Sequence, residues 1–157
     1  MATSYLHYLV SQAGKTTLIN CLTGITAPDI TSKHTTIYGS RLDSDLASVR
    51  KNIGVCPQHD VLFEKLTIRE TIVLFSLLKG KMYTFSEAES EADELLKMFQ
   101  LQKQADYVGA ELSGGMKRKL SVAIAVCGGS RFVLLDEPTS GMGKFILAFS
   151  DPRQSCL

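Results

Sequence analysis

The hydrophobic positions of this chain follow two patterns, one typical of helices and one typical of buried strands. Apolar residues recur every three or four positions in five segments, which predicts amphipathic helices over 15–23, 43–51, 67–78, 86–99 and 113–127. Continuous or alternating apolar runs predict short strands at 35–38, 53–56 and 132–135, whereas 1–12 shows no clear period. Helices that alternate with buried strands predict an α/β fold with a largely parallel sheet.

Local signals mark several helix ends. Thr67 and Glu70 have the spacing of a capping box, and Ser86 and Glu89 repeat it, so helices are expected to open at both places. Gly24 suits the position just after a helix. For the helix that opens at Ser86, the periodicity predicts a buried face made of Ala88, Ala92, Leu95, Leu96 and Phe99.

Composition excludes some classes of protein. The 157 residues fit one domain with one core, and a net charge of +1 gives no bulk attraction to nucleic acid or acidic membranes. No apolar run is long enough for a membrane helix, and no secretory signal is visible at the start. The four cysteines form no C-x-x-C pair and lack histidines at zinc spacing, which favours reduced thiols.

A glycine followed by lysine and hydroxyl residues precedes the first predicted helix: Gly14, Lys15, Thr16 and Thr17. Backbone amides at a helix start favour anions, glycine allows close approach of phosphate, and lysine adds a positive charge. A threonine hydroxyl at this position can bind Mg²⁺. The full phosphate-loop pattern has a further glycine where this chain has Leu9, so an ordinary helix start remains an alternative for this segment taken alone.

Two acidic residues, Asp136 and Glu137, follow the predicted buried strand at 132–135. Ligands of open α/β sheets bind at the carboxyl ends of strands. A carboxylate there can hold Mg²⁺, and a second one can polarise a water molecule. The alternative for this segment alone is a polar turn broken by Pro138.

Ser113, Gly114 and Gly115 open the helix at 113–127. A serine hydroxyl, free backbone amides and the positive end of a helix dipole form a second site suited to an anion. Helix capping alone would explain Ser113. It would not explain two glycines in the first turn, where each costs about 1 kcal/mol relative to alanine.

Four groups of residues follow one another along the chain: Gly14-Lys15-Thr16-Thr17 (Walker A), Gln58 after a strand, Leu112-Ser113-Gly114-Gly115 (the signature motif) and Leu135-Asp136-Glu137-Pro138 (Walker B). Their order and spacing resemble those of the ATP-binding cassettes of ABC transporters. The resemblance covers about 13–142. The stretches 53–63 and 111–130 further resemble the A subfamily, which is associated with lipids. The resemblance implies a P-loop NTPase fold with a mostly parallel sheet and a helical subdomain at about 60–127 that carries the signature motif.

The resemblance also implies roles for single residues, with ATP and Mg²⁺ as cofactors. Gly14, Lys15, Thr16 and Thr17 would bind ATP, with Lys15 in contact with its phosphates. Thr16, Gln58 and Asp136 would bind or reach the metal. Gln58 and Glu137 would be catalytic, Gln58 near the attacking water and Glu137 as the base.

Ser113, Gly114 and Gly115 would act in trans, on the ATP of a second nucleotide-binding domain arranged head to tail with this one. The other implied partners are the transmembrane domains of an ABC transporter, which would place the chain at the cytosolic face of a membrane. No chemistry is expected of His59, which simply follows Gln58.

Parts of the family pattern are missing. Gly143-Lys144 stands where the family has Asp-Pro, and no histidine follows His59. We therefore expect an incomplete cassette with divergent ends at 1–12 and 143–157. One alternative to an ATP-hydrolysing transporter component is a non-catalytic cassette that binds nucleotide or pairs with an intact one. A soluble cassette ATPase acting on nucleic acid or ribosomes is disfavoured, since no heptads or basic cluster separate the motifs.

The loop after Gln58 is rich in apolar residues: Val61, Leu62, Phe63 and Leu66. Apolar side chains gathered in a loop indicate burial against something. We expect the surface at 58–66 to dock onto the cytosolic helices of a transporter. The alternative is that these side chains fold back onto the core of the domain itself.

Overall fold

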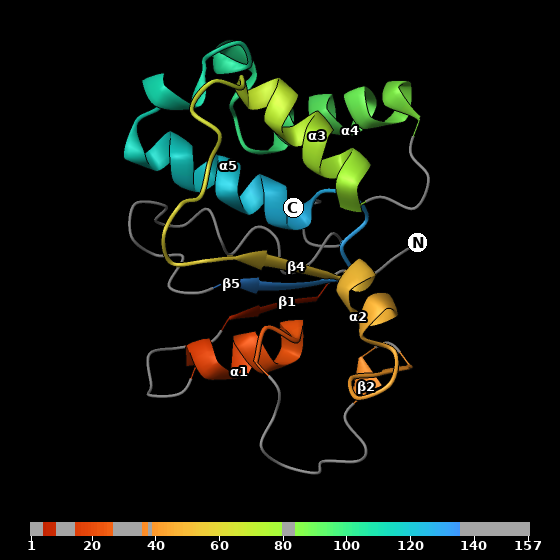
Figure 1. Cartoon of the computed structure of the whole chain (residues 1–157). Coiled ribbons are helices and arrows are strands. Elements are labelled where there is room, and N and C mark those ends of the chain that lie inside the picture. The colour runs from red at the N-terminus through yellow and green to blue at the C-terminus, as the bar shows by residue number, and fades with distance from the viewer. Residues whose placement is uncertain (1–4, 9–14, 27–35, 38, 80–83, 136–157) are drawn as a thin grey trace, which may run out of the picture.

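The computed structural model describes residues 5–8, 15–26, 36–37, 39–79 and 84–135 of the chain (Figure 1). Two short 3-10 helices, η1 and η2, accompany five α-helices and five strands in this part of the chain. In chain order the elements are β1 Tyr5–Tyr8, α1 Lys15–Thr23, β2 Thr36–Ile37, β3 Ser40–Arg41, α2 Leu46–Asn52, β4 Ile53–Cys56, α3 Ile68–Lys79, α4 Phe85–Met98, η1 Gln102–Gln104, η2 Gly109–Glu111, α5 Gly114–Val126 and β5 Phe132–Leu135.

The described strands of the main sheet are all parallel. Their order is β1-β5-β4, so β5 pairs with both neighbours. The register pairs Tyr8 and Cys56 with Leu135, which brings the carboxyl ends of all three strands level with one another. The predicted α/β fold with a parallel sheet is therefore confirmed.

Helices cover both faces of this sheet (Figure 1). Val133 and Leu135 of β5 belong to a core cluster with α3, α4 and α5, whereas Leu134 packs with Ile19 of α1 and Val49 of α2. Successive side chains of β5 thus point to opposite faces of the sheet, as the pleat of a strand requires. The helix α5 lies directly against β4 and β5, and α3 and α4 pack beyond it.

The strand β1 was not predicted, since 1–12 shows no period. Tyr5–Tyr8 nevertheless runs parallel to β5 and pairs with it along its whole length. A four-residue strand at this position depends on pairing with β5, and the local sequence does not show that pairing.

The predicted strand at 35–38 is shorter than expected, at Thr36–Ile37, and forms an antiparallel hairpin with β3. Gly39, in the turn between them, has φ +81°.

The predicted cap of α3 is confirmed and that of α4 is wrong. The Thr67 amide donates to Glu70 Oε2 at 2.8 Å, and the Glu70 amide donates to Thr67 Oγ1 at 3.1 Å. In α4 the capping box is made instead by Thr84 and Glu87, and Ser86 lies within the first turn. Both pairs have the same spacing. The earlier one lengthens the helix, and each added residue contributes another intrahelical bond.

Other local predictions hold. The predicted buried face of α4 is buried throughout, including Phe99, its C-cap. The helix α2, Leu46–Asn52, begins inside the predicted 43–51 segment and ends just beyond it. It is capped by Asp45, whose side chain accepts from the Ser48 amide. Gly24 ends α1 with φ +70°, and the Gly24 and Ile25 amides donate to Cys21 O and Asn20 O. This pair of bonds is a Schellman motif.

The described cysteines are free thiols. Cys21 is partly exposed, whereas Cys56 and Cys127 are buried. Burial raises the pKa of each buried thiol to about 11. Both are therefore protonated and unreactive near neutral pH. The expectation of reduced thiols is met for these three, and Cys156 lies outside the described residues.

Within the described helices, none is long and apolar enough to cross a membrane.

Candidate functional site

The carboxyl edge of the sheet is the place where the predicted functional segments begin. The loop with Gln58 follows β4 after Pro57, and Asp136 and Glu137 follow the last residue of β5. The helix α1, which begins at Lys15, runs back under the sheet from this edge, and α5 also starts on this side (Figure 1). Ligands of open parallel sheets bind at such an edge.

Part of the predicted site lies outside the described residues, namely Gly14, Asp136 and Glu137. Lys15 and Thr16 form the first turn of α1, but only their backbone is described. Thr17 is exposed. The roles of these residues therefore stay predictions, and so does the division of the helices at about 60–127 into a subdomain.

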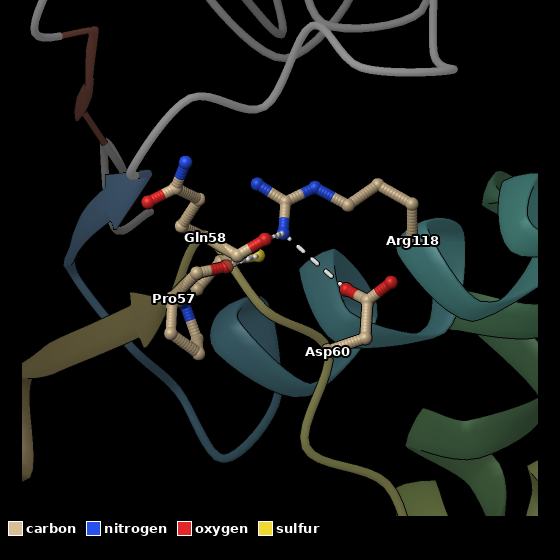
Figure 2. Close-up of polar contacts among 5 residues, drawn as sticks. Pro57, Gln58, Asp60 and Arg118 are labelled. Atoms are coloured by element: carbon tan, nitrogen blue, oxygen red, sulfur yellow. Dashed lines mark hydrogen bonds and ion pairs between the residues drawn. The ribbon is translucent and has the colours of Figure 1, made fainter.

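The Gln58 loop is exposed, and its backbone is held from α5. Arg118 Nη1 donates to Pro57 O at 2.6 Å and to Gln58 O at 3.4 Å, and it lies 3.3 Å from Asp60 Oδ1 (Figure 2). The Arg118 side chain is only 3% exposed. The carboxamide of Gln58 points away from Asp60 in the same view.

Sequence reasoning missed Arg118 because it stands between Lys117 and Lys119, where a run of charges indicates a solvated face. The spacing of apolar residues along α5 could have shown that Arg118 lies on a buried face. Residues 118, 122 and 125 share one face of α5, and Val122 and Ala125 are buried apolar residues. An arginine on that face must find partners inside the domain.

The signature segment has the predicted cap. The Met116 amide donates to Ser113 Oγ at 3.3 Å, and Ser113 has extended backbone angles, with φ −64° and ψ 158°. Ser113 and Gly114 are exposed, and Gly115 is partly buried. A Cβ atom added at Gly114 would meet no atom within 4 Å. Packing therefore does not require glycine at 114, which favours a role in the close approach of a ligand.

We expect Gly114→Ala to leave the free energy of unfolding unchanged or to raise it by up to about 1 kcal/mol, the helix preference of alanine over glycine. Gly109→Ala is the matched control, because its Cβ would lie 2.4 Å from Phe63 O, and this variant should be destabilised. Urea unfolding of both variants and the wild type measures this. Equal destabilisation of the two would mean that the fold does require glycine at 114.

The apolar loop divides into two parts. Leu62 packs against the main core and Leu66 is partly buried, as the fold-back alternative predicts. Val61 is 78% exposed and Phe63 51%, with the Phe63 ring 6.2 Å from that of Phe75. Two apolar side chains of this loop thus remain available for contact with another molecule.

The predicted metal ligands, Thr16, Gln58 and Asp136, carry the oxygen donors that Mg²⁺ prefers. No group of three histidine, cysteine or acidic side chains gathers within the ranges that the structure describes, as a closed metal site would require. Mg²⁺ commonly takes one or two protein oxygens and completes its shell with phosphate oxygens and water. Gln58 is exposed and its side-chain oxygen is a donor of this kind, whereas Thr16 and Asp136 stay predicted ligands.

Comparison with known proteins identifies the class. The sequence profile described as "ABC transporter" matches residues 10–140. A solved "Structure of ATP binding subunit of ABC transporter" superposes with a TM-score of 0.72 at 27% identity, covering 94% of this chain and 60% of that one. A dimeric post-hydrolysis structure of the ATP-binding cassette MJ0796, bound to ADP and phosphate, has a TM-score of 0.67 at 25% identity, covering 87% and 61%. The chain belongs to the ABC transporter family and has the ATP-binding cassette fold of a P-loop NTPase.

Curated relatives specify the subfamily. The mouse "Phospholipid-transporting ATPase ABCA3" is 45% identical over 130 residues, 83% of this chain and 7% of that protein. The human "ATP-binding cassette sub-family A member 2" is 45% identical over 85% of this chain and 5% of its own length. The mouse "Glucosylceramide transporter ABCA12" is 45% identical over 83% and 5%. The resemblance to the A subfamily is thus confirmed, and the chain spans less than a tenth of the length of these relatives.

Proposed function

We propose that this chain supplies one half of a composite Mg-ATP site that powers lipid transport by an A-subfamily ABC transporter. The observation that carries the proposal is the level carboxyl edge of β1, β5 and β4, from which the segments with Lys15, Asp136 and Gln58 continue. The start of α5, with Ser113, lies on the same side (Figure 1). The family membership supplies ATP as the ligand.

The proposed chemistry follows from phosphoryl transfer. Lys15 and the amides at the start of α1 would hold the phosphates and stabilise the negative charge that shifts among their oxygens. Bound Mg²⁺ would neutralise part of that charge, held by Thr16, Asp136 and Gln58. Glu137 would orient a water molecule in line with the bond that breaks.

The other half of each site would come from a second cassette. Ser113 and Gly114 are exposed at the start of α5, where they would be accessible to a nucleotide on a facing domain. The similar MJ0796 cassette was solved as a dimer bound to hydrolysis products. We propose that this chain also pairs with a second cassette, head to tail, as the family resemblance implies. If this chain is non-catalytic, its partner would be an intact cassette.

The membrane partner would bind through the loop after Gln58. The names of two relatives refer to transport of phospholipid and glucosylceramide, so we assign a lipid as cargo and the cytosolic face of a membrane as the location. Val61 and Phe63 would contact a cytosolic helix of the transmembrane domains, since both are apolar and exposed beside Gln58.

Val61→Ser should reduce co-purification with a co-expressed transmembrane domain, because it removes apolar contact area from this surface. Phe85→Ser is the matched control, since Phe85 is an exposed apolar residue, 63% accessible, at the start of α4. Circular dichroism checks that both variants are folded. If the two variants co-purify equally well, the loop is not the docking surface.

Steady-state phosphate release separates the ATPase from its non-catalytic alternative. The isolated chain is expected to show little or no turnover, since a single chain holds only half of each site and Gly143-Lys144 replaces Asp-Pro. Addition of an intact A-subfamily cassette should raise the rate if this chain completes a working site, and Glu137→Gln should abolish the gain. Unchanged rates on mixing would favour a chain that binds nucleotide without hydrolysing it.

A further inference from the structure

Arg118 is an unusual residue for the interior of a small domain. Only 2% of it is exposed, although Lys117 and Lys119 on either side are partly exposed. A buried charge is costly unless it is paired and hydrogen-bonded, and an apolar residue of similar volume would often serve stability as well. The reason for an arginine at this position should therefore lie in what it contacts.

Three acceptors of its Nη1 atom belong to one short segment. They are Pro57 O at 2.6 Å, Asp60 Oδ1 at 3.3 Å and Gln58 O at 3.4 Å. The shortest is a charge-assisted bond to the carbonyl directly before Gln58. Together with the bond to Gln58 O, it restrains the peptide planes on both sides of the Gln58 Cα atom, and with them the direction in which the Gln58 side chain leaves the backbone.

Arg118 itself lies close to the signature residues. It is on α5, which opens immediately after Ser113, and Gly114 and Gly115 form its first residues. The same helix thus carries the signature residues at its start and, through Arg118, holds the Gln58 loop, as Figure 2 shows for the loop contact. In the proposed dimer these two features serve different nucleotides, the partner's ATP and this chain's own.

We propose that Arg118 is a positioning residue: it ties the backbone of Gln58 to α5, so that the signature residues and the Gln58 carboxamide move as one unit. The effect of Arg118 on the metal site is exerted through Gln58. This inference rests on the proposed function, because it concerns the role of Gln58 in holding Mg-ATP.

The first test needs no nucleotide. Hydrogen exchange is measured on the whole chain for peptides that cover 57–62, in wild type, Arg118→Met and Arg69→Met. Arg69 is the control, since its ion pair with Asp93, at 2.7 Å, joins α3 to α4 and involves no residue of 57–62. We expect exchange in 57–62 to quicken about tenfold or more in Arg118→Met and to stay unchanged in Arg69→Met. Unchanged exchange in Arg118→Met would overturn the inference.

The second test asks whether the effect passes through Gln58. Mg-ATP affinity is measured for Arg118→Met, Gln58→Ala and the double variant. Arg118→Met should weaken binding by about threefold to thirtyfold in the wild-type background and hardly at all in the Gln58→Ala background, as expected of coupled residues. A merely structural arginine would weaken binding equally in both backgrounds, and that result would overturn the inference.

Asp60→Asn serves if Arg118→Met does not fold, because Asp60 is at the surface and the variant removes only the ionic part of the contact. Its effects on exchange and affinity should be smaller and of the same sign, and an absence of both would also overturn the inference. Failure of the wild type to bind Mg-ATP would instead count against the proposed function, while the exchange experiment would still decide whether Arg118 tethers the loop.

Discussion

Gly54→Ala is expected to destabilise the protein by about 3 kcal/mol, at the upper end of what added core atoms usually cost. A Cβ atom at this position would lie 1.7 Å from Ala125 O and 2.7 Å from Ala125 C. Both are backbone atoms of α5, so no side-chain rotation can relieve the overlap. The strand β4 would have to move away from the helix on which it packs.

This shift would also reach the candidate site. Gly54 lies on the strand that leads to Gln58, and Arg118 holds the following loop against the same helix. Urea unfolding measures the effect, with Gly114→Ala as the control because its Cβ would meet no atom within 4 Å. An unfolding midpoint equal to that of the wild type would contradict the close packing of β4 on α5.

Features that depend on neighbouring residues could be predicted from the sequence. The cap at Thr67 and the end of α1 at Gly24 involve bonds across a few residues, so the local pattern contains them. The strands β4 and β5 are continuous apolar runs buried within the sheet, and they appear where they were expected. Helix faces such as that of α4 follow directly from the spacing of apolar residues.

Features that depend on tertiary contacts could not be predicted from the sequence. Tyr5–Tyr8 becomes a strand because β5 pairs with it, and its own sequence has no distinctive period. Arg118 is buried because α5 turns that face toward the Gln58 loop, although its neighbours in sequence indicate a solvated run. In the apolar loop, sequence could not decide between docking and folding back. The structure buries Leu62 and exposes Val61.

The candidate site was predicted from motifs more than from physical pattern. The spacing of the phosphate loop, the signature and the acidic strand end identified the family, which the comparisons confirm. The structure adds the level carboxyl ends of the three strands, which no motif specifies. It also shows that packing does not require Gly114, which strengthens the argument for a ligand at the start of α5.

Lys15→Ala is expected to weaken Mg-ATP binding about ten- to a hundredfold. The ammonium group would make a charge-assisted contact with phosphate, and such contacts contribute roughly 1.5–3 kcal/mol. The wild-type affinity should itself be modest, since Leu9 stands where the full phosphate-loop pattern has glycine. Lys51→Ala is the matched control, because Lys51 is an exposed lysine on α2.

The most direct measurement is an equilibrium titration of the wild type, Lys15→Ala and Lys51→Ala with a fluorescent ATP analogue in the presence of Mg²⁺. We expect saturable binding by the wild type and Lys51→Ala with the same dissociation constant, and a dissociation constant at least about tenfold higher for Lys15→Ala. Equal dissociation constants for all three proteins would contradict the assignment of the phosphate loop, and with it the claim that this chain forms half of a Mg-ATP site.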